Sequence, residues 1–335
     1  MRRSTEDRPA PPLRLSRSRG GRITARALGQ AEAHHHHRDP KARTSVTQST
    51  SSPELDGFVK PGQGSGLVDV FRRRYLLTLL VRKEVQVRYR GSVLGWLWSY
   101  VKPVTQFLVF FIALGVFLQL NGTIPNYPVY LFSGLILVNL FSEAFSNGTR
   151  SLVDNAALIK KIYLPRELFP VSSTLVALVN FLPQVLVLGV VCLFVGWRPN
   201  LLQILGVLLG LTIIVVLAMG LSLLFGSVNV SFRDAENFVE LIVLVATWAS
   251  PVLYQVSVVA KVLPEWLMVI YQLNPLTAAV QLMHAGFWLP TTDGAGDLPD
   301  DLLEYGLFAL LLSLAILVVG QFVFRKLERR FAQDL

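Results

Sequence analysis

Side chains able to do catalytic or metal chemistry are scarce in this sequence, and none has the spacing of a known catalytic motif. There is no G-x-x-x-x-G-K-[ST] phosphate loop, no nucleophile elbow, no H-E-x-x-H helix and no cysteine and histidine cluster. The histidine run 34–37 has no second ligand cluster, which favours a solvated tract over a metal site. The single thiol, Cys192, lies in an apolar run, where a packing role is usual. We therefore predict no catalytic residue, no metal and no cofactor on this chain.

Cations, in contrast, stand where they can meet an anionic ligand. Arg88, Arg90 and Lys102 flank the first long apolar run of the chain. Arginine holds phosphate oxygens through paired donors, whereas lysine acts as a point charge. We interpret the three residues as candidates for binding a lipid headgroup. Binding of bulk anionic lipid, which is worth about 1 kcal/mol per charge, is the alternative.

The elements that must position these cations are predicted to be transmembrane helices. Hydrophobic residues make up 52% of the chain and charged residues only 16%, against roughly 25% in soluble proteins. Six apolar runs are each near the ~20 residues that cross ~30 Å of hydrocarbon. They cover residues 96–120, 127–145, 169–197, 201–228, 238–254 and 302–324. The predicted fold class is an all-α integral membrane protein with six transmembrane helices.

Positive charge is distributed as expected for a membrane protein with both termini in the cytoplasm. Most lysines and arginines lie in residues 1–102, 147–168 and 325–330, which alternate with uncharged apolar runs. Such residues stay cytoplasmic during insertion, so the net charge of +9 does not indicate nucleic-acid binding. We predict three parts, which are a disordered basic cytoplasmic tail (1–66), an amphipathic interface helix (67–95) and a six-helix transmembrane domain (96–335).

The stretch 256–300 does not fit the pattern of full spans. Its apolar pieces, 258–263 and 266–273, are too short to cross a bilayer and are interrupted by prolines, of which Pro275 should break any helix at Asn274. We expect short re-entrant helices that dip into the membrane from outside and shape a channel exit. An ordinary extracellular loop is the alternative. The candidate exit residues are Trp266, Tyr271, Asn274 and Pro275.

The predicted spans contain very few ionisable residues. Glu143 and Glu240 lie near predicted cytoplasmic ends, and none lies at a membrane centre. Ion-coupled pumps generally need buried charged groups along the transport path. We therefore expect another subunit to supply the energy for any transport.

Six motifs, in order along the chain, carry a resemblance to a known family. They are VRYRGSVLGWLWSYVKP at 87–103, YPVYLFSG at 127–134, KKIYLPRE at 160–167, FRD at 232–234, SPVLY at 250–254 and NPLT at 274–277. Over residues 67–335 the chain resembles permeases of type-2 ABC transporters that export polysaccharides and polyol phosphates. Its composition and long basic tail look most like actinobacterial members.

This resemblance implies an exporter that depends on partners. Two copies of the permease would pair with two copies of a separate ATP-binding subunit, which carries ATP and Mg, in the bacterial cytoplasmic (inner) membrane. The dimer would pass a glycan linked to polyprenyl pyrophosphate through a channel. A galactan-type cell-wall precursor is favoured over O-antigen and teichoic acid. Membrane lipid is an expected partner and nucleic acid is not.

Two further sets of candidate residues accompany the resemblance. The polar segment 147–168 suits contact with the ATPase, with a plain positive-inside loop as the alternative. The coupling candidates are Asn155, Lys160, Lys161, Tyr163, Pro165, Arg166 and Glu167. Aromatic side chains stack on sugar rings, although packing and lipid-facing roles are common for them. The channel candidates are Phe107, Phe110, Phe111, Phe141, Phe145, Trp248 and Tyr254.

Two other function classes remain open from the sequence. A permease for drugs or small lipids would share the topology but is not expected to match 87–103 and 256–290 so well. A membrane glycosyltransferase needs carboxylates to hold a metal and a nucleotide sugar. The dense acidic cluster of the chain, at 293–301, falls on the predicted outer side, away from nucleotide sugars.

Overall fold

The structure, a computed structural model, describes residues 66–89, 98–162, 164–292, 296, 298–299 and 301–334. Across these ranges the regular secondary structure is helical, with no strand. Several predictions concern residues outside these ranges, namely the basic tail apart from Gly66, the cation Arg90 and the coupling candidate Tyr163.

The segment predicted as one amphipathic helix contains two helices. α1 (Leu67–Arg72) and α2 (Arg74–Tyr89) meet at Arg73. Leu80 of α2 is buried, because this helix packs on α7 (Leu168–Phe194). The cations of α2 are exposed side chains.

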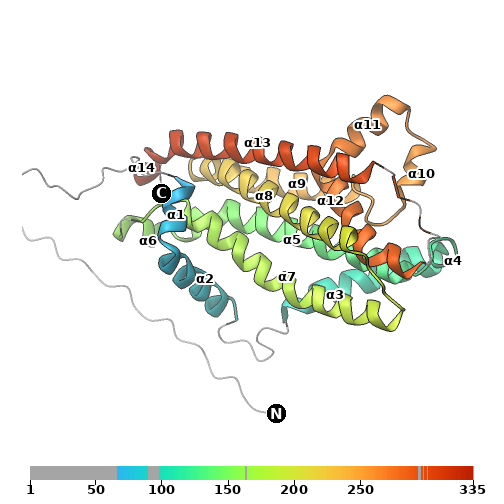
Figure 1. Cartoon of the computed structure of the whole chain (residues 1–335). Coiled ribbons are helices and arrows are strands. Elements are labelled where there is room, and N and C mark those ends of the chain that lie inside the picture. Colours follow the sequence, from blue (N-terminus) through green and yellow to red (C-terminus); the bar gives the residue numbers. More distant parts are fainter. Residues whose placement is uncertain are drawn as a thin grey trace, which may run out of the picture. The chain divides into compact units, whose positions relative to one another are not determined.

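Among the described residues, five helices are long and apolar enough to cross a membrane. They form at five of the six predicted runs, where a helix satisfies its backbone groups internally. They are α3 (Trp98–Phe110) with its π-helical continuation η2 (Phe111–Phe117), α5 (Tyr127–Asp154), α7, α8 (Leu201–Ser231) and α13 (Leu302–Glu328) (Figure 1).

The sixth predicted run, 238–254, forms a shorter helix. α9 (Ala235–Trp248) has 14 residues, fewer than a full crossing needs. Ser231, at the end of α8, donates a hydrogen bond to Asp334 beyond the end of α13, and α13 begins at the opposite end of the bundle (Figure 1). The segment between α8 and α13 therefore begins at one end of the bundle and ends at the other. A sixth transmembrane helix in this segment stays a prediction.

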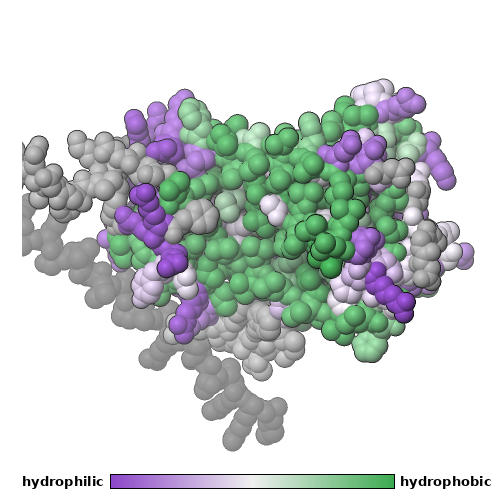
Figure 2. Space-filling model, in the orientation of Figure 1, coloured by the Kyte–Doolittle hydropathy of each residue, from purple (hydrophilic) through white to green (hydrophobic). Residues whose placement is uncertain are grey.

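Short helices lie at the two ends of the bundle. α4 (Leu120–Thr123), α10 (Val256–Ala260) and α11 (Glu265–Leu273) lie at one end, and α6 (Ala156–Lys161) and α14 (Phe331–Asp334) lie at the other (Figure 1). Figure 2 shows a broad apolar band between polar groups at both ends. Exposed leucines such as Leu186 of α7 and Leu311 of α13 belong to the apolar outer surface, as expected for side chains that face lipid.

The segment after α11 turns into the bundle. α12 (Pro275–Met283) is buried at every residue, packs against α8, α13 and α5, and continues into η3 (His284–Trp288) and η4 (Leu289–Thr291). Asn274 caps it, since its Oδ1 accepts from the backbone N–H of Leu276 at 3.1 Å. The predicted break at Pro275 is confirmed.

Within the predicted re-entrant stretch, α12 is the helix that inserts into the bundle. The piece 266–273, most of which forms α11, has no buried residue. Entry of the pieces 258–263 and 266–273 into the membrane stays a prediction. The polar residues Thr277 and Gln281 of α12 interrupt the apolar run, so composition alone did not single this helix out.

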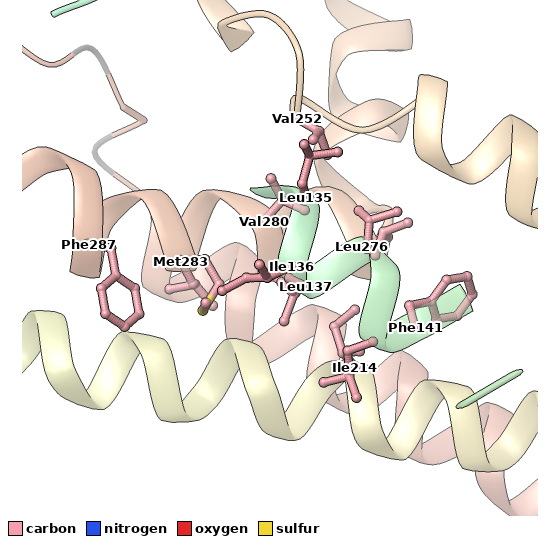
Figure 3. Packing of buried hydrophobic residues seen from close by; sticks show 14 of the residues in the cluster. Leu135, Ile136, Leu137, Phe141, Ile214, Val252, Leu276, Val280, Met283 and Phe287 are labelled. Atoms are coloured by element: carbon pink, nitrogen blue, oxygen red, sulfur yellow. The ribbon is translucent and has the colours of Figure 1, made fainter. Parts of the chain in front are cut away.

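The core is built around α5, α8 and α12. Its buried side chains include Ile136, Ile214 and Leu276, which converge from these three helices (Figure 3). α8 and α13 approach closely where Gly220 faces Gly320, and a methyl group on Gly320 would collide with the carbonyl oxygen of Gly220. Small residues at such a crossing let helix backbones pack directly within a membrane.

Candidate functional site

A cavity of about 1290 Å³ opens between helices in the described part of the chain. Its walls come from the end of α2 and from α3, α5, α7 and α9. These elements are far apart in sequence, and the cavity exists because α3 and α9 flank α5 without closing over it. Its lining is mixed, with charged, amide, hydroxyl and aromatic side chains.

One face of α5 supplies the polar wall of the cavity. Successive polar side chains recur every three or four residues, which places them on one side of a helix. They are Asn139, Ser142, Glu143, Ser146, Asn147 and Arg150. Glu143 was identified from the sequence as ionisable, but the periodic polar stripe around it, which was the available signal, was not.

Phe141 and Phe145 were predicted to face a channel, and the structure corrects this. They lie on the other side of α5, buried to 2% and 0% exposure in the hydrophobic core. Phe145 meets Phe225 of α8 edge to face, with ring centroids 5.4 Å apart, and Phe141 lies among the core side chains of Figure 3. Helical periodicity is the reason, because the two residues are one turn apart and lie on the apolar side of the helix.

Two clusters of ion pairs lie along the cavity. In one, Glu143 pairs with Arg88 of α2 and also accepts a hydrogen bond of 2.7 Å from Asn180 Nδ2 of α7. In the other, Arg150 of α5 pairs with Glu240 of α9 at 2.8 Å and with Glu236 at 3.0 Å. The charged groups of both clusters are partly exposed, so the net contribution of these ion pairs to stability is small. Their effect is to orient the charged groups and to neutralise one another.

Two of the three predicted headgroup cations line this cavity together. Arg88 and Lys102 come from α2 and α3. Arg88 is held by Glu143, whereas Lys102 is exposed and has no ion pair among the described residues. The third candidate, Arg90, lies outside the described residues.

Polar contacts fix α2, and therefore Arg88, against the bundle. Ser172 Oγ of α7 donates to Glu84 at 2.8 Å, and Lys83 Nζ donates to Asn155 Oδ1 at 2.9 Å. Burial raises the pKa of the Glu84 carboxyl, although the hydrogen bond from Ser172 and the charge of Lys83 act in the opposite direction. Since Glu84 and Arg88 are four residues apart, they lie on the same side of α2.

The remaining aromatic candidates divide between the cavity and its surroundings. Phe110 of α3 and Trp248 of α9 line the cavity and meet edge to face, with centroids 6.3 Å apart. Phe107 and Phe111 stack on each other at 5.9 Å and pack against the core. Tyr254 donates from its hydroxyl to the carbonyl oxygen of Trp248 at 2.6 Å.

The coupling candidates lie at the end of the bundle that carries α6. Lys160 and Lys161 are exposed, so a partner can reach them. Arg166 and Glu167 instead bind within the chain. Arg166 bonds the carbonyl oxygen of Glu328 and lies over the ring of Phe331, and Glu167 accepts from Gln321 Nε2 at 3.2 Å. Asn155 accepts from Lys83, and Pro165 is partly buried.

The four exit candidates lie away from the cavity walls. Trp266 is 66% exposed on α11, and Tyr271 is partly buried on the same helix. Asn274 caps α12, and Pro275 is its buried first residue. Whether they meet a passing ligand stays a prediction.

Apolar spans around a cavity with one polar wall define this chain as a multi-pass membrane protein. Residues 75–288 match the family model described as "ABC-2 type transporter", and the chain belongs to this family. It is similar to the "O-antigen export system permease protein RfbA" of Klebsiella pneumoniae, with 30% identity over 78% of this chain and 95% of the relative. The protein of the same name from Myxococcus xanthus is 30% identical over 80% and 98%.

A more distant relative is named as a transport protein. The "Polysialic acid transport protein KpsM" of Escherichia coli is 24% identical over 61% of this chain and 77% of its own length. The family recognised from the sequence motifs is therefore confirmed. An actinobacterial origin is not tested by these matches.

Proposed function

We propose that this chain is the transmembrane subunit of an ATP-driven exporter of polysaccharide, and that the cavity is one wall of the path taken by the sugar chain. The observation that carries the proposal is the polar α5 wall of a cavity that the membrane-spanning helices α3, α5 and α7 help to form. The printed functions of the relatives, O-antigen export and polysialic acid transport, support the same class of cargo.

The dimensions and chemistry of the cavity suit an extended sugar ligand. Pockets for drug-sized molecules usually enclose about 300–1,000 Å³, whereas this one reaches about 1290 Å³. Among its lining side chains is a wall of amides and hydroxyls. Phe110 and Trp248 add aromatic surface on which a sugar ring can stack. This lining favours a glycan over an apolar drug or a small lipid.

The cations of the cavity suit a lipid carrier that ends in phosphate. Lys102 offers a charge that no other described residue neutralises, and Arg88, which Glu143 holds, lines the same cavity. In this proposal the cargo is a glycan linked to polyprenyl pyrophosphate, and a galactan-type precursor remains the favoured glycan. Glu143 and Glu240 are paired with arginines, which is not the arrangement that a glycosyltransferase needs to hold a metal.

A second copy of the chain is proposed to close the path. α3 and α9, which flank the cavity, expose apolar side chains such as Leu108 and Leu244. Two ATP-binding subunits, which carry ATP and Mg, would contact the end that bears Lys160 and Lys161. In this proposal the complex lies in the bacterial cytoplasmic membrane with both termini in the cytoplasm, in agreement with the positive-inside pattern.

Depletion of this chain in its host tests the proposal. Cells fed a radioactive sugar should lose labelled surface polysaccharide and accumulate labelled lipid-linked glycan on the cytoplasmic side of the membrane. Normal surface polysaccharide together with increased retention of a drug or a small lipid would contradict it and favour the alternative cargo class.

A further inference from the structure

The fixed charges of the cavity nearly cancel. Its described lining contains five ionisable side chains, which are Arg88, Lys102, Glu143, Arg150 and Glu240. Arg88 is paired with Glu143, and Arg150 with Glu240. Glu236 gives Arg150 a second carboxylate at 3.0 Å from just outside the lining. Lys102 is therefore the one described lining cation without a carboxylate beside it.

Away from these charges, the lining is uncharged and combines polar side chains with apolar ones. Asn139 lies about 22 Å from Asp154, the last residue of α5, at about 1.5 Å per residue. The α5 lining residues on the N-terminal side of Glu143 include no ionisable group. Asn180 and Gln184 of α7 and Thr247 of α9 add amides and a hydroxyl. Gln184 donates to the carbonyl oxygen of Asn180 at 3.1 Å, while its own Oε1 has no partner in the described structure and its side chain is only 7% exposed.

Such a wall suits hydroxyl groups and not a row of anions. A sugar hydroxyl both donates and accepts, so it can bond an amide oxygen such as that of Gln184 as well as an amide nitrogen. A carboxylate or phosphate on every repeat would bring a charge into a partly desolvated space without a matching cation, and such a charge is costly to bury. The existing arginines offer no compensation because carboxylates already neutralise them.

We propose that the cavity selects polysaccharides whose repeating units are uncharged. In this proposal, Lys102 binds the negative charge at the carrier end of the cargo, and the repeating units bring no further charge. This inference rests on the proposed function, and it narrows the cargo to one chemical class of glycan. Two features would select uncharged glycans. They are the neutralised pairs Arg88–Glu143 and Arg150–Glu240 and the uncharged part of the lining, which includes Gln184.

Protection of an introduced thiol in the cavity tests the proposal. Thr247→Cys in a Cys192→Ala background places a thiol on the lining, since Thr247 lines the cavity and Cys192 is buried. The full chain in lipid nanodiscs is labelled with uncharged N-ethylmaleimide in the presence of an oligomer of galactose or of galacturonic acid. The two probes share linkage and length and differ by a carboxylate at C6. Val262→Cys, 79% exposed on the α10–α11 turn, is the control thiol.

The expected result is a difference between the two probes in the Thr247→Cys variant alone. The concentration that gives half-protection should be at least about tenfold lower for the galactose oligomer than for the galacturonate oligomer. This ratio corresponds to a difference of about 1.4 kcal/mol in binding free energy. Equal protection by both probes would overturn charge selection while leaving the cavity as a glycan site. Protection by neither probe would overturn the proposed function as well.

A charge variant tests the proposal through a change in probe preference, which loss of folding would not produce. Glu143→Gln removes the carboxylate that neutralises Arg88, so the ratio of the two half-protecting concentrations should shift at least about tenfold toward galacturonate. Glu304→Gln, an equal charge change on the exposed first turn of α13, should leave the ratio unchanged. An unchanged ratio in Glu143→Gln would contradict the proposal.

Discussion

Glu143 shows how one residue joins three helices at the cavity. It lies on α5, pairs with Arg88 of α2 and accepts from Asn180 of α7. A carboxylate near the hydrocarbon region is costly unless it is paired. Its pairing satisfies the carboxylate and at the same time sets where the guanidinium of Arg88 is presented to a ligand.

Removal of the unpaired cavity cation Lys102 should impair export without impairing folding. Lys102→Ala should lower export of labelled lipid-linked glycan at least about tenfold, because a charge-assisted contact to phosphate is worth roughly 1.5–3 kcal/mol. Arg82→Ala removes the same charge from an exposed position on α2 and should export normally. Wild-type export in the Lys102→Ala variant, at equal expression, would contradict the headgroup role of Lys102.

Glu84 should make the docking of α2 depend on pH. Its pKa is raised from the ordinary value of 4.5 by burial, so the carboxyl favours folding when it is protonated. This stabilisation is fully present below the unfolded pKa and is lost as the pH rises through the raised folded pKa. The thermal midpoint of the wild type relative to Glu84→Gln should therefore fall as the pH increases over this window. A difference that is constant with pH would contradict the assignment.

At the scale of elements, the long apolar helices were predictable and the irregular ones were not. α7 and α8 were read correctly because an apolar run of this length has few alternatives to a membrane helix. α12 was missed because Thr277 and Gln281 interrupt its apolar pattern, although tertiary packing buries them. The cavity was not predictable as a unit, because it depends on which faces of α3, α5, α7 and α9 meet.

Close packing of α8 on α13 gives an element-scale prediction. Gly320→Ala places a methyl group against the carbonyl oxygen of Gly220, and the required shift should cost about 1–3 kcal/mol. Gly189→Ala in α7 meets open space and should be neutral or stabilising by up to about 1 kcal/mol. Thermal unfolding of both purified variants checks this, and equal midpoints would contradict the helix crossing.

At the scale of the whole molecule, the helix bundle has two polar ends with an apolar band between them (Figure 2). Single cysteines in a Cys192→Ala background and an impermeant thiol reagent added outside test which end faces out. Val262 and Trp266 should be labelled, because they are exposed on the α10–α11 end. Ala278 and Ala279 of α12 should be protected, because they are buried. Labelling of a cysteine at Val262 only from the cytoplasm would contradict the predicted topology.

The most direct test of the central claim is a photo-crosslink between the cavity and the sugar chain during export. A photoreactive phenylalanine analogue replaces Trp248 in the cavity, or Phe322, which is 69% exposed on α13 and outside the lining. In exporting cells fed a radioactive sugar, the Trp248 position should become covalently labelled with glycan and the Phe322 position should not. Active export without label at Trp248, or with equal label at Phe322, would contradict a path through this cavity.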